Sequence, residues 1–494
     1  MIRFKKGRPL VNMLMVFRVI GWLLMIEAAF MLIPLVVALA TQGPDVKAFV
    51  VTFAATVVAG GFLTFLLPRS QYDMSKRDGF MLTALVWVFF SLFGMIPFMF
   101  EPLGMSAVDA FFETMSGFST TGATLLDGTK GAMPTGIIIW RCLIQWIGGM
   151  GIIIFTLAVL PMLNSSGGVQ MFNAEVTGIT HDKLRPRVSQ TAKGLWGIYI
   201  SLTTILFVLL WLGPMDFFES LCQAFSIMST GGYVPAYMDL SEYDSSYLDV
   251  TATVFMFLGG VNFGLIFSVV TGNYKAPWRN EVFRTYVITI AVMYVLFVAG
   301  IVAAGQFDGL RSVTIEPIFI IVSMMSSTGY VNSAFVGWGA FVMSLSLLMM
   351  FFGACAGSTS GGAKLDRLLY LVKSLRNELY RGLHPNSIQS VKISGKMVPP
   401  DLVGKVLAFL CLYVVMIIGG GVALTAVGCP LYDAFFASFS SISNSGLIPG
   451  ITGYGNTYLE VPEAGRLILS MLMMIGRLEV FTVVLIFSPA FWNK

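Results

Sequence analysis

Charged residues are scarce in this 494-residue chain: only 11% of its residues are Asp, Glu, Lys or Arg, whereas 56% are hydrophobic. Soluble domains carry roughly a quarter charged residues, so the composition excludes an ordinary water-soluble enzyme. The aromatic content of 13% excludes a disordered chain as well. Because a membrane-spanning helix needs about 20 apolar residues, a chain of this kind has room for about ten spans. The sequence therefore predicts a polytopic membrane protein.

Cysteine and histidine are also few, with five and two residues respectively. The cysteines are scattered, odd in number and without CxxC spacing, which excludes a disulfide framework and a thiolate metal site. His181 and His384 both fall in polar segments, which excludes a histidine metal site in the membrane. The net charge of +4 is too small to indicate nucleic acid binding. We expect no enzymatic activity and no organic cofactor in this chain.

Long apolar windows are predicted to cross the membrane. They lie at about 11–40, 47–67, 79–100, 134–161, 194–213, 250–271, 285–305, 338–353, 402–428 and 464–490. With a cytoplasmic N-terminus, 23 of the 30 basic residues fall in the inner segments, as the positive-inside rule requires. Both termini are therefore predicted to be cytoplasmic.

Four shorter segments lie between the spans and align with one another without gaps. They read Asp109-AFFETMSGFSTTG-Ala123, Glu219-SLCQAFSIMSTGG-Tyr233, Glu316-PIFIIVSMMSSTG-Tyr330 and Asp433-AFFASFSSISNSG-Leu447. In each copy an acidic residue stands 13 positions before a glycine. The repeat predicts the order span, short helix, loop, span, four times, after two extra N-terminal spans.

The short segments have a physical reading as pore loops. About ten helical residues cover roughly 15 Å, half the hydrocarbon thickness, and the acid at the start is expected to cap the helix. The irregular backbone that follows is tolerated at membrane depth only where it lines a water-filled cavity. Carbonyl oxygens of four such loops around one axis would form a cation filter, and glycine permits the backbone angles that this requires. The predicted ion ligands are Thr120, Thr121, Gly122, Thr230, Gly231, Gly232, Ser327, Thr328, Gly329, Asn444, Ser445 and Gly446.

The predicted fold is an all-α integral membrane protein. It has ten transmembrane helices and four re-entrant pore helices, arranged as four pseudo-symmetric units around one pore. The expected units are 1–75 for the two extra spans, then 76–193, 194–280, 281–395 and 396–494 for the four pore units.

The fourfold arrangement, with loops such as SGFSTTGAT, resembles the Trk/Ktr/HKT superfamily of potassium transporters. The two extra spans and the segment IGRLEVFTVVLIFSPAFW from Ile475 make the chain similar to the bacterial TrkH branch. The resemblance implies K⁺ uptake across the bacterial inner membrane, with Rb⁺ also accepted. Sodium-preferring relatives often carry serine where this chain has Gly122, so the resemblance favours K⁺. It further implies a homodimer and a cytosolic, nucleotide-binding regulatory subunit of the TrkA type.

A second run of small residues follows the eighth window, at 354–364. It contains Gly357, Ser358, Gly361, Gly362 and Lys364. Small-residue backbone at that depth indicates a water-lined cavity below the filter, where a mobile loop could block the path. The alternative is a helix end followed by a linker. Arg477, inside the last window, is expected either to raise a barrier to cations or to form a structural ion pair. The resemblance implies that this loop and Arg477 gate the pore.

Other readings stay open on the sequence alone. A proton- or sodium-coupled symporter would need an acid at the ion site, and only Glu27, Glu113 and Glu479 are candidates in the membrane. A sodium-permeable channel of the same fold is a further possibility. An intramembrane enzyme would need a nucleophile, paired acids or a metal site, and the sequence shows none. Glu113 is expected to anchor the filter from behind, whereas Arg18 and Arg141 are expected to be packing or interfacial charges.

Overall fold

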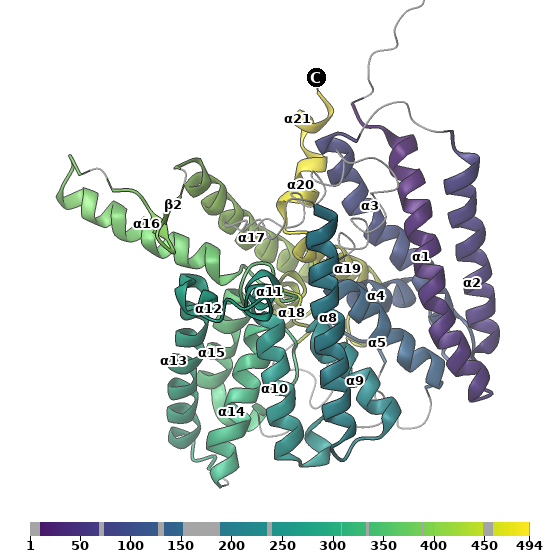
Figure 1. Ribbon diagram of the computed structural model, residues 1–494, viewed down its shortest axis with the longest axis horizontal. Helices are drawn as coiled ribbons and strands as arrows, with labels where there is room; N and C mark the ends of the chain where they lie inside the picture. The colour runs from purple at the N-terminus through teal and green to yellow at the C-terminus, as the bar shows by residue number, and fades with distance from the viewer. Residues whose placement is uncertain are drawn as a thin grey trace, which may run out of the picture.

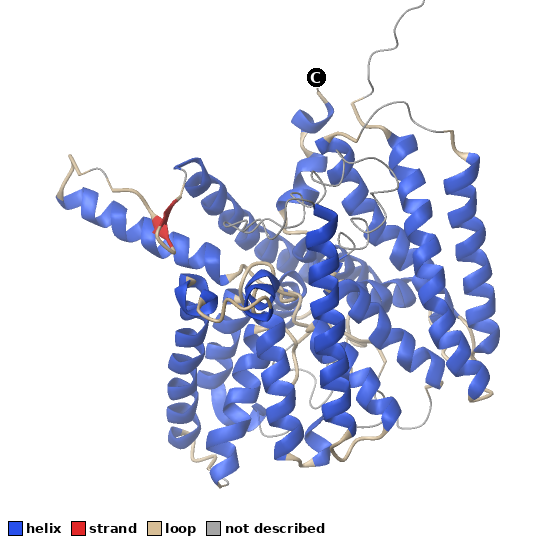
Figure 2. Cartoon of the chain, in the orientation of Figure 1, coloured by secondary structure: helices blue, strands red, loops and turns tan. Residues whose placement is uncertain are grey.

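The computed structural model describes most of the chain. The described residues are 10–68, 74–126, 133–151, 188–234, 240–307, 309–331, 335–387, 389–398, 400–447 and 458–493. Within them the protein is helical apart from loops and one short antiparallel hairpin of β1 (Lys392–Ile393) and β2 (Lys396–Met397) (Figure 2). Both chain ends, the basic segment at 183–187 and the second half of the 134–161 window lie outside the described residues.

Six helical stretches are long and apolar enough to cross a membrane among the residues described. The stretches are Met13–Ala40, Val46–Leu66, Arg77–Met99, Lys193–Trp211, Glu281–Ala303 and Leu402–Ala426. The helices in them are α1 (Met13–Ala40), α2 (Val46–Gly61), α3 (Lys76–Gly94), α8 (Val188–Trp211), α13 (Glu281–Ala303) and α17 (Pro400–Ala426). A π-helical turn, Phe62–Leu66, follows α2, and a 3₁₀ turn, Ile96–Met99, follows α3. The prediction of a helical membrane protein is confirmed at this level, whereas the number ten stays a prediction.

Two further windows, which the sequence predicts as continuous spans, are sharply bent. Helices α10 (Ser246–Gly260) and α11 (Phe263–Val270) meet at 103°, and α19 (Glu463–Arg477) and α20 (Phe481–Phe487) meet at 114°. At the first break the Asn262 side chain accepts hydrogen bonds from the Gly264 and Leu265 N–H groups and starts a new helix. At the second break Glu479 and Val480 have positive φ, which a helix cannot contain.

The remaining helices are shorter. They are α4 (Ala107–Phe118), α5 (Thr135–Gly149), α9 (Phe217–Ser229), α12 (Ala276–Arg279), α14 (Leu310–Met325), α15 (Gly339–Phe352), α16 (Leu365–Leu383), α18 (Leu431–Ser443) and α21 (Pro489–Trp492), with 3₁₀ turns at Leu240–Tyr243 and Phe335–Trp338. In Figure 1, α1, α2 and α3 stand together at one edge and α13, α14 and α15 at the opposite edge, while α16 runs sideways from the bundle.

Local sequence fixes where the N-terminal spans begin and how they meet. Ser75 and Asp78 form a capping box at the start of α3, in which each side chain accepts the other residue's N–H. The Asp78 carboxylate also accepts the backbone N–H of Asn12, just before α1, at 2.6 Å. One acidic side chain therefore aligns the starts of two adjacent spans.

The four repeated acids are not the helix caps that the sequence predicts. Ser106 caps α4 and Asp216 caps α9, so Asp109 and Glu219 lie three positions further on and are free for tertiary contacts. Asp109 forms an ion pair with Arg466 at the start of α19. Helix α14 begins earlier than expected, at Leu310, so its acid lies in the second turn. Glu219 accepts a hydrogen bond from the Tyr243 hydroxyl, so two of the four acids tie the starts of their helices to neighbouring segments.

Candidate functional site

The four short helices α4, α9, α14 and α18 end in loops that share one backbone conformation. The residue two positions before each loop glycine has positive φ: Thr120 at 54°, Thr230 at 53°, Ser327 at 57° and Asn444 at 52°. The glycines follow with φ of 80° at Gly122, 78° at Gly232, 80° at Gly329 and 68° at Gly446. Non-glycine residues rarely adopt positive φ, so the fourfold recurrence marks a backbone that the surrounding structure enforces.

The loops form a closed ring. A Cβ added to the glycine of each loop would overlap a backbone carbonyl oxygen of the next loop in chain order. The pairs are Gly122 with Gly231, Gly232 with Thr328, Gly329 with Ser445, and Gly446 with Thr121. The fourth loop therefore returns to the first, and all four sequence-predicted loops come together at one place. Backbone approaches this close require glycine.

The ring presents backbone oxygens in a buried setting. The residues are all buried apart from Gly232, which is half-buried. No described residue donates a hydrogen bond to the carbonyls of Thr120–Gly122 or Ser327–Gly329, or to those of Thr230, Gly232, Asn444 and Ser445. Buried carbonyls are normally paired, because an unpaired one loses its hydration without compensation. These oxygens are thus available to another partner.

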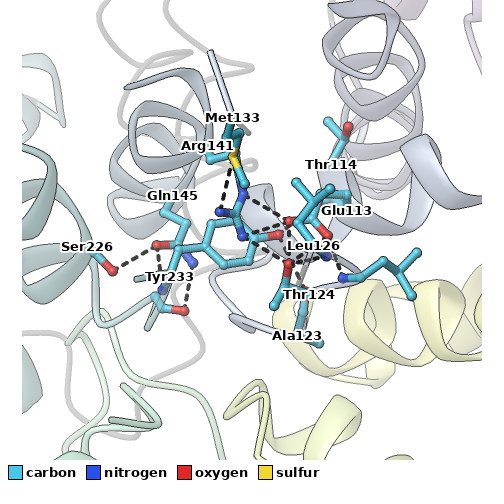
Figure 3. Close-up of polar contacts among 12 residues, drawn as sticks. Glu113, Thr114, Ala123, Thr124, Leu126, Met133, Arg141, Gln145, Ser226 and Tyr233 are labelled. Atoms are coloured by element: carbon cyan, nitrogen blue, oxygen red, sulfur yellow. Dashed lines mark hydrogen bonds and ion pairs between the residues drawn. The ribbon is translucent and has the colours of Figure 1, made fainter. Parts of the chain in front are cut away.

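A buried ion pair supports the first loop from behind. Glu113 on α4 accepts a hydrogen bond from Arg141 Nε on α5 at 3.0 Å, and both side chains are almost fully buried (Figure 3). The Glu113 carboxylate also accepts from Thr124 Oγ1 and from the Leu125 N–H, both at 2.9 Å. Glu113 is therefore an anchor, as the sequence predicts. Of the two expectations for Arg141, a packing charge and an interfacial charge, the structure favours the first, because the buried ion pair joins α5 to α4.

The segment between α15 and α16 lies directly against three of the loops or the helix ends that lead into them. The N–H of Gly361 donates to Ser327 Oγ at 2.6 Å, and the N–H of Gly362 donates to the Ser443 carbonyl at 3.0 Å. Thr359 Oγ1 lies 3.2 Å from Thr230 Oγ1. This segment, residues 353–364, thus touches the second, third and fourth loops or the helix ends that lead into them. It is hereafter the subfilter segment.

The other small residues of the subfilter segment fold it against the α10–α11 break. Asn262 Nδ2 donates to the Ala356 carbonyl at 2.6 Å, and a Cβ on Gly357 would collide with the Asn262 side chain. Ser358 Oγ lies 2.6 Å from the Cys355 carbonyl, to which it donates. The break in the α10–α11 span and the subfilter segment therefore hold each other in place.

Arg477 completes the contact with the first unit. Its guanidinium donates to the Thr359 carbonyl at 2.8 Å and to the Gly148 and Gly149 carbonyls, at the end of α5, at 2.7 and 3.1 Å. A Cβ on Gly148 would overlap the Phe118 carbonyl at the end of α4. Arg477 thus links the subfilter segment to the end of α5, which packs on the end of α4.

A cluster of charges closes the inner end of the subfilter segment. Glu479 forms ion pairs with Lys364, at 3.4 Å, and with Arg367 on α16. The charge cluster thus engages Glu479 with these two cations, whereas Arg477 donates to the three backbone carbonyls named above. Asp366 adjoins the cluster: burial raises the pKa of its carboxyl, and the nearby Arg367 and Lys364 oppose that rise.

Sequence reasoning missed the polar side chains that stand behind the loops. Gln145 on α5, with Tyr233 and Tyr330, contacts the second and third loops and the helices behind them. Both tyrosines directly follow a loop glycine in the aligned segments, which is the signal that could have identified them. Gln145 carries no such signal, since a lone glutamine in an apolar helix has many structural explanations.

Comparisons with known proteins identify the family of the chain. The TrkH family of proteins, described as cation transport proteins, matches residues 45–494. The potassium uptake protein TrkH of Salmonella typhimurium is 33% identical over 97% of this chain and 99% of its own length, and TrkG of Escherichia coli is 29% identical over 96% and 97%. The crystal structure of the potassium transporter TrkH from Vibrio parahaemolyticus superposes with a TM-score of 0.87 at 29% identity, covering 98% of this chain and all of that one. The chain belongs to the TrkH family of cation transport proteins.

Proposed function

We propose that this protein takes up K⁺ across the bacterial inner membrane through the ring of four loops. Its relatives in Salmonella typhimurium and Escherichia coli are named potassium uptake proteins, and they match this chain over nearly its whole length. No covalent chemistry is needed, because the ion moves down its electrochemical gradient through a pore.

The buried, unpaired carbonyls of the ring carry this proposal. In the described structure ten of the twelve loop carbonyls receive no hydrogen bond from the protein, so a dehydrated cation is the partner that would satisfy them. The other two, of Gly231 and Gly446, accept from Gln145 and Tyr458. None of the predicted ligand residues has a carboxylate, which disfavours a site for a divalent cation. The twelve loop residues named above are proposed to line the filter, with their ten unpaired carbonyls as the ion ligands. Rb⁺, which resembles K⁺ in size, is expected to pass as well.

The proposed architecture places these loops at mid-membrane. The short helices α4, α9, α14 and α18 dip in from the outer side as re-entrant pore helices, each between two spans, to give ten spans and four pore units around one axis. The four shared loop conformations and the cyclic contacts between loops support this fourfold arrangement. The basic inner segments support cytoplasmic termini.

The subfilter segment and Arg477 are proposed to close the pore on the cytoplasmic side. The segment abuts three loop units, and Arg477 reaches the fourth, so together they cover the inner mouth of the ring. The Arg477 guanidinium adds an electrostatic barrier for a cation. Gly357, Ser358, Gly361, Gly362 and Lys364 are the proposed moving parts. Resemblance to the family supports a homodimer regulated by a cytosolic nucleotide-binding subunit of the TrkA type.

Ion flux into liposomes tests the proposal. Purified protein is reconstituted, and uptake of K⁺, Rb⁺, Na⁺ and Li⁺ is compared under identical gradients. We expect K⁺ and Rb⁺ to enter faster than Na⁺ and Li⁺. Equal flux of Na⁺ and K⁺ would refute a potassium filter, and uptake that depends on a proton or sodium gradient would replace the channel-like mechanism with a symport.

A further inference from the structure

Two buried tyrosines connect each of two loops to the pore helix of the preceding loop. Tyr233, directly after Gly232, donates its hydroxyl hydrogen to the Glu113 carbonyl on α4 at 2.6 Å. Tyr330 stands at the same place in the third loop, and its hydroxyl donates to Gln223 Oε1 on α9 at 2.8 Å. Both side chains are at most 2% exposed. The tyrosines thus link neighbouring units from outside the ring.

Gln145 holds the second loop between these two links. Its Nε2 donates to the Gly231 carbonyl at 2.7 Å, and its Oε1 accepts from Ser226 Oγ at 3.0 Å and from the Tyr233 N–H at 3.2 Å (Figure 3). Ser226 Oγ in turn lies 2.9 Å from the Tyr330 hydroxyl. Because the Gly231 carbonyl is held from behind, the orientation of the peptide plane between Gly231 and Gly232 is fixed, and with it the carbonyls on either side.

The contacts form one continuous network behind three loops. It runs from Tyr330 through Ser226 and Gln145 to Tyr233, and from Tyr233 to the Glu113–Arg141 pair, since the Arg141 guanidinium lies 4.4 Å from the centre of the Tyr233 ring. A buried polar network in which the members are paired is rigid, because any displacement leaves a polar group unpaired in a dry environment.

The tyrosines of this network have no counterpart in the first and fourth loops. Ala123 and Leu447 follow the loop glycines there and have no hydroxyl. Near these loops Tyr458, from the segment after the fourth loop, donates its hydroxyl to the Gly446 carbonyl at 3.2 Å and its N–H to the Thr124 carbonyl at 2.9 Å. The fourth and first loops are thus joined through a different residue and a different geometry.

We infer that Gln145, Tyr233 and Tyr330 are positioning residues that set the discrimination between K⁺ and Na⁺. They touch no ion; they fix the spacing of the loops whose carbonyls replace the hydration shell. A ring that is free to contract can also fit the smaller Na⁺, whereas a ring held from behind keeps the spacing that suits K⁺. This inference rests on the proposed function of the ring as a filter.

The test uses the full-length protein in liposomes, with the ratio of K⁺ to Na⁺ uptake as its readout. The variants Tyr233→Phe and Tyr330→Phe each remove one hydroxyl and keep the ring. We expect the K⁺/Na⁺ ratio to fall about threefold to tenfold in each, as loss of one buried hydrogen bond allows, with K⁺ uptake itself largely kept. A nonconservative variant, Gln145→Leu, should lower the ratio of K⁺ to Na⁺ uptake at least as much.

The matched control is Tyr294→Phe. Tyr294 also donates to a backbone carbonyl of a short helix, that of Val313 in α14, at 2.9 Å, but it does so at the end far from the ring. Loss of the Tyr294 hydroxyl should leave the ratio of K⁺ to Na⁺ uptake unchanged. If both loop variants fold and keep the wild-type ratio, or if the control changes it equally, the inference is overturned. If the wild type itself does not discriminate, the proposed filter fails instead, so the two failures are distinguishable.

Discussion

The ring of loops and the subfilter segment lie in contact, yet different kinds of interaction hold them in place. In the ring, each of the four glycines packs on a carbonyl oxygen of the next loop, and no ring residue is charged. The subfilter segment has such a backbone contact as well, Gly361 on the Ser443 carbonyl, but it also depends on the charged side chains of Arg477, Lys364 and Glu479. Backbone packing therefore dominates in the ring, whereas charged side chains add reversible polar contacts to the subfilter segment.

The difference indicates how the proposed filter and the proposed gate could work a few ångströms apart. Steric contact between backbones limits how far the ring can rearrange, and the side chains behind it fix the spacing that remains. Hydrogen bonds and ion pairs can be exchanged for water or for other partners at a net cost of about 1 kcal/mol each. A segment held in that way can move while the ring above it stays in place. The predictions below separate these two kinds of support.

Replacing a ring glycine should have the largest effect. In Gly122→Ser the new Cβ would overlap the Gly231 carbonyl, and serine would also have to adopt a φ of 80°. Strain of about 1–3 kcal/mol must be relieved by moving the second loop. We expect the K⁺/Na⁺ uptake ratio in liposomes to fall by about tenfold or more. Gly404→Ser, on an exposed face of α17 with open space around it, is the control, and an equal ratio in both variants would show that the ring tolerates a side chain.

Removing the acid of the charge cluster should have the next largest effect, on stability. Glu479→Gln leaves the half-buried Lys364 and the buried Arg367 without their shared carboxylate. Breaking a buried ion pair typically costs about 3–5 kcal/mol. The melting temperature in detergent should fall by several degrees and basal K⁺ flux should rise. Glu463→Gln, at an exposed position of α19, should change neither, and a wild-type melting temperature for the Glu479 variant would contradict the role of the cluster.

Removing the guanidinium should open the pore without changing its selectivity. Arg477→Gln loses the bonds to the Gly148, Gly149 and Thr359 carbonyls. We expect basal K⁺ flux to rise about tenfold at an unchanged K⁺/Na⁺ uptake ratio. The flux of Arg477→Lys should lie between those of the wild type and Arg477→Gln, since lysine cannot reproduce the planar, forked guanidinium of arginine. Deletion of residues 354–364 should raise basal flux further. Unchanged or lower flux in either folded variant would count against a gate at this place.

A single hydroxyl of the subfilter segment should have the smallest effect. Thr359→Val removes contacts to Thr230 Oγ1 and to the Gly259 carbonyl, at 3.2 and 3.1 Å. The loss of about 1 kcal/mol predicts a rise in basal flux of about fivefold or less. Thr204→Val, which loses a hydroxyl bond on an exposed face of α8, should leave flux unchanged. A fall in the K⁺/Na⁺ uptake ratio for the Thr359 variant would show that the ring and the subfilter segment are not independent.

Much of the fold could be predicted because membrane insertion and repetition are properties of the chain itself. Spans need long apolar runs, and four gapless segments with the same acid-to-glycine spacing can be found without knowing any contact. The bends at Asn262 and at Glu479 could not be predicted, because an apolar window looks the same whether its helix continues or turns. The partner of Arg141 could not be predicted either, since Glu113 is 28 residues away on another helix.

The sequence by itself determined the family, the helical membrane fold and the four glycine-centred loops, because each is encoded in composition or in local spacing. It also determined that almost no charge is available to the ring. Tertiary structure alone decided that each loop glycine packs on the next loop's carbonyl, that Tyr233 and Gln145 stand behind the ring, and that Arg477 reaches the end of α5. These contacts join residues about 100 or more positions apart in most cases, and only the packing of helices brings such residues together.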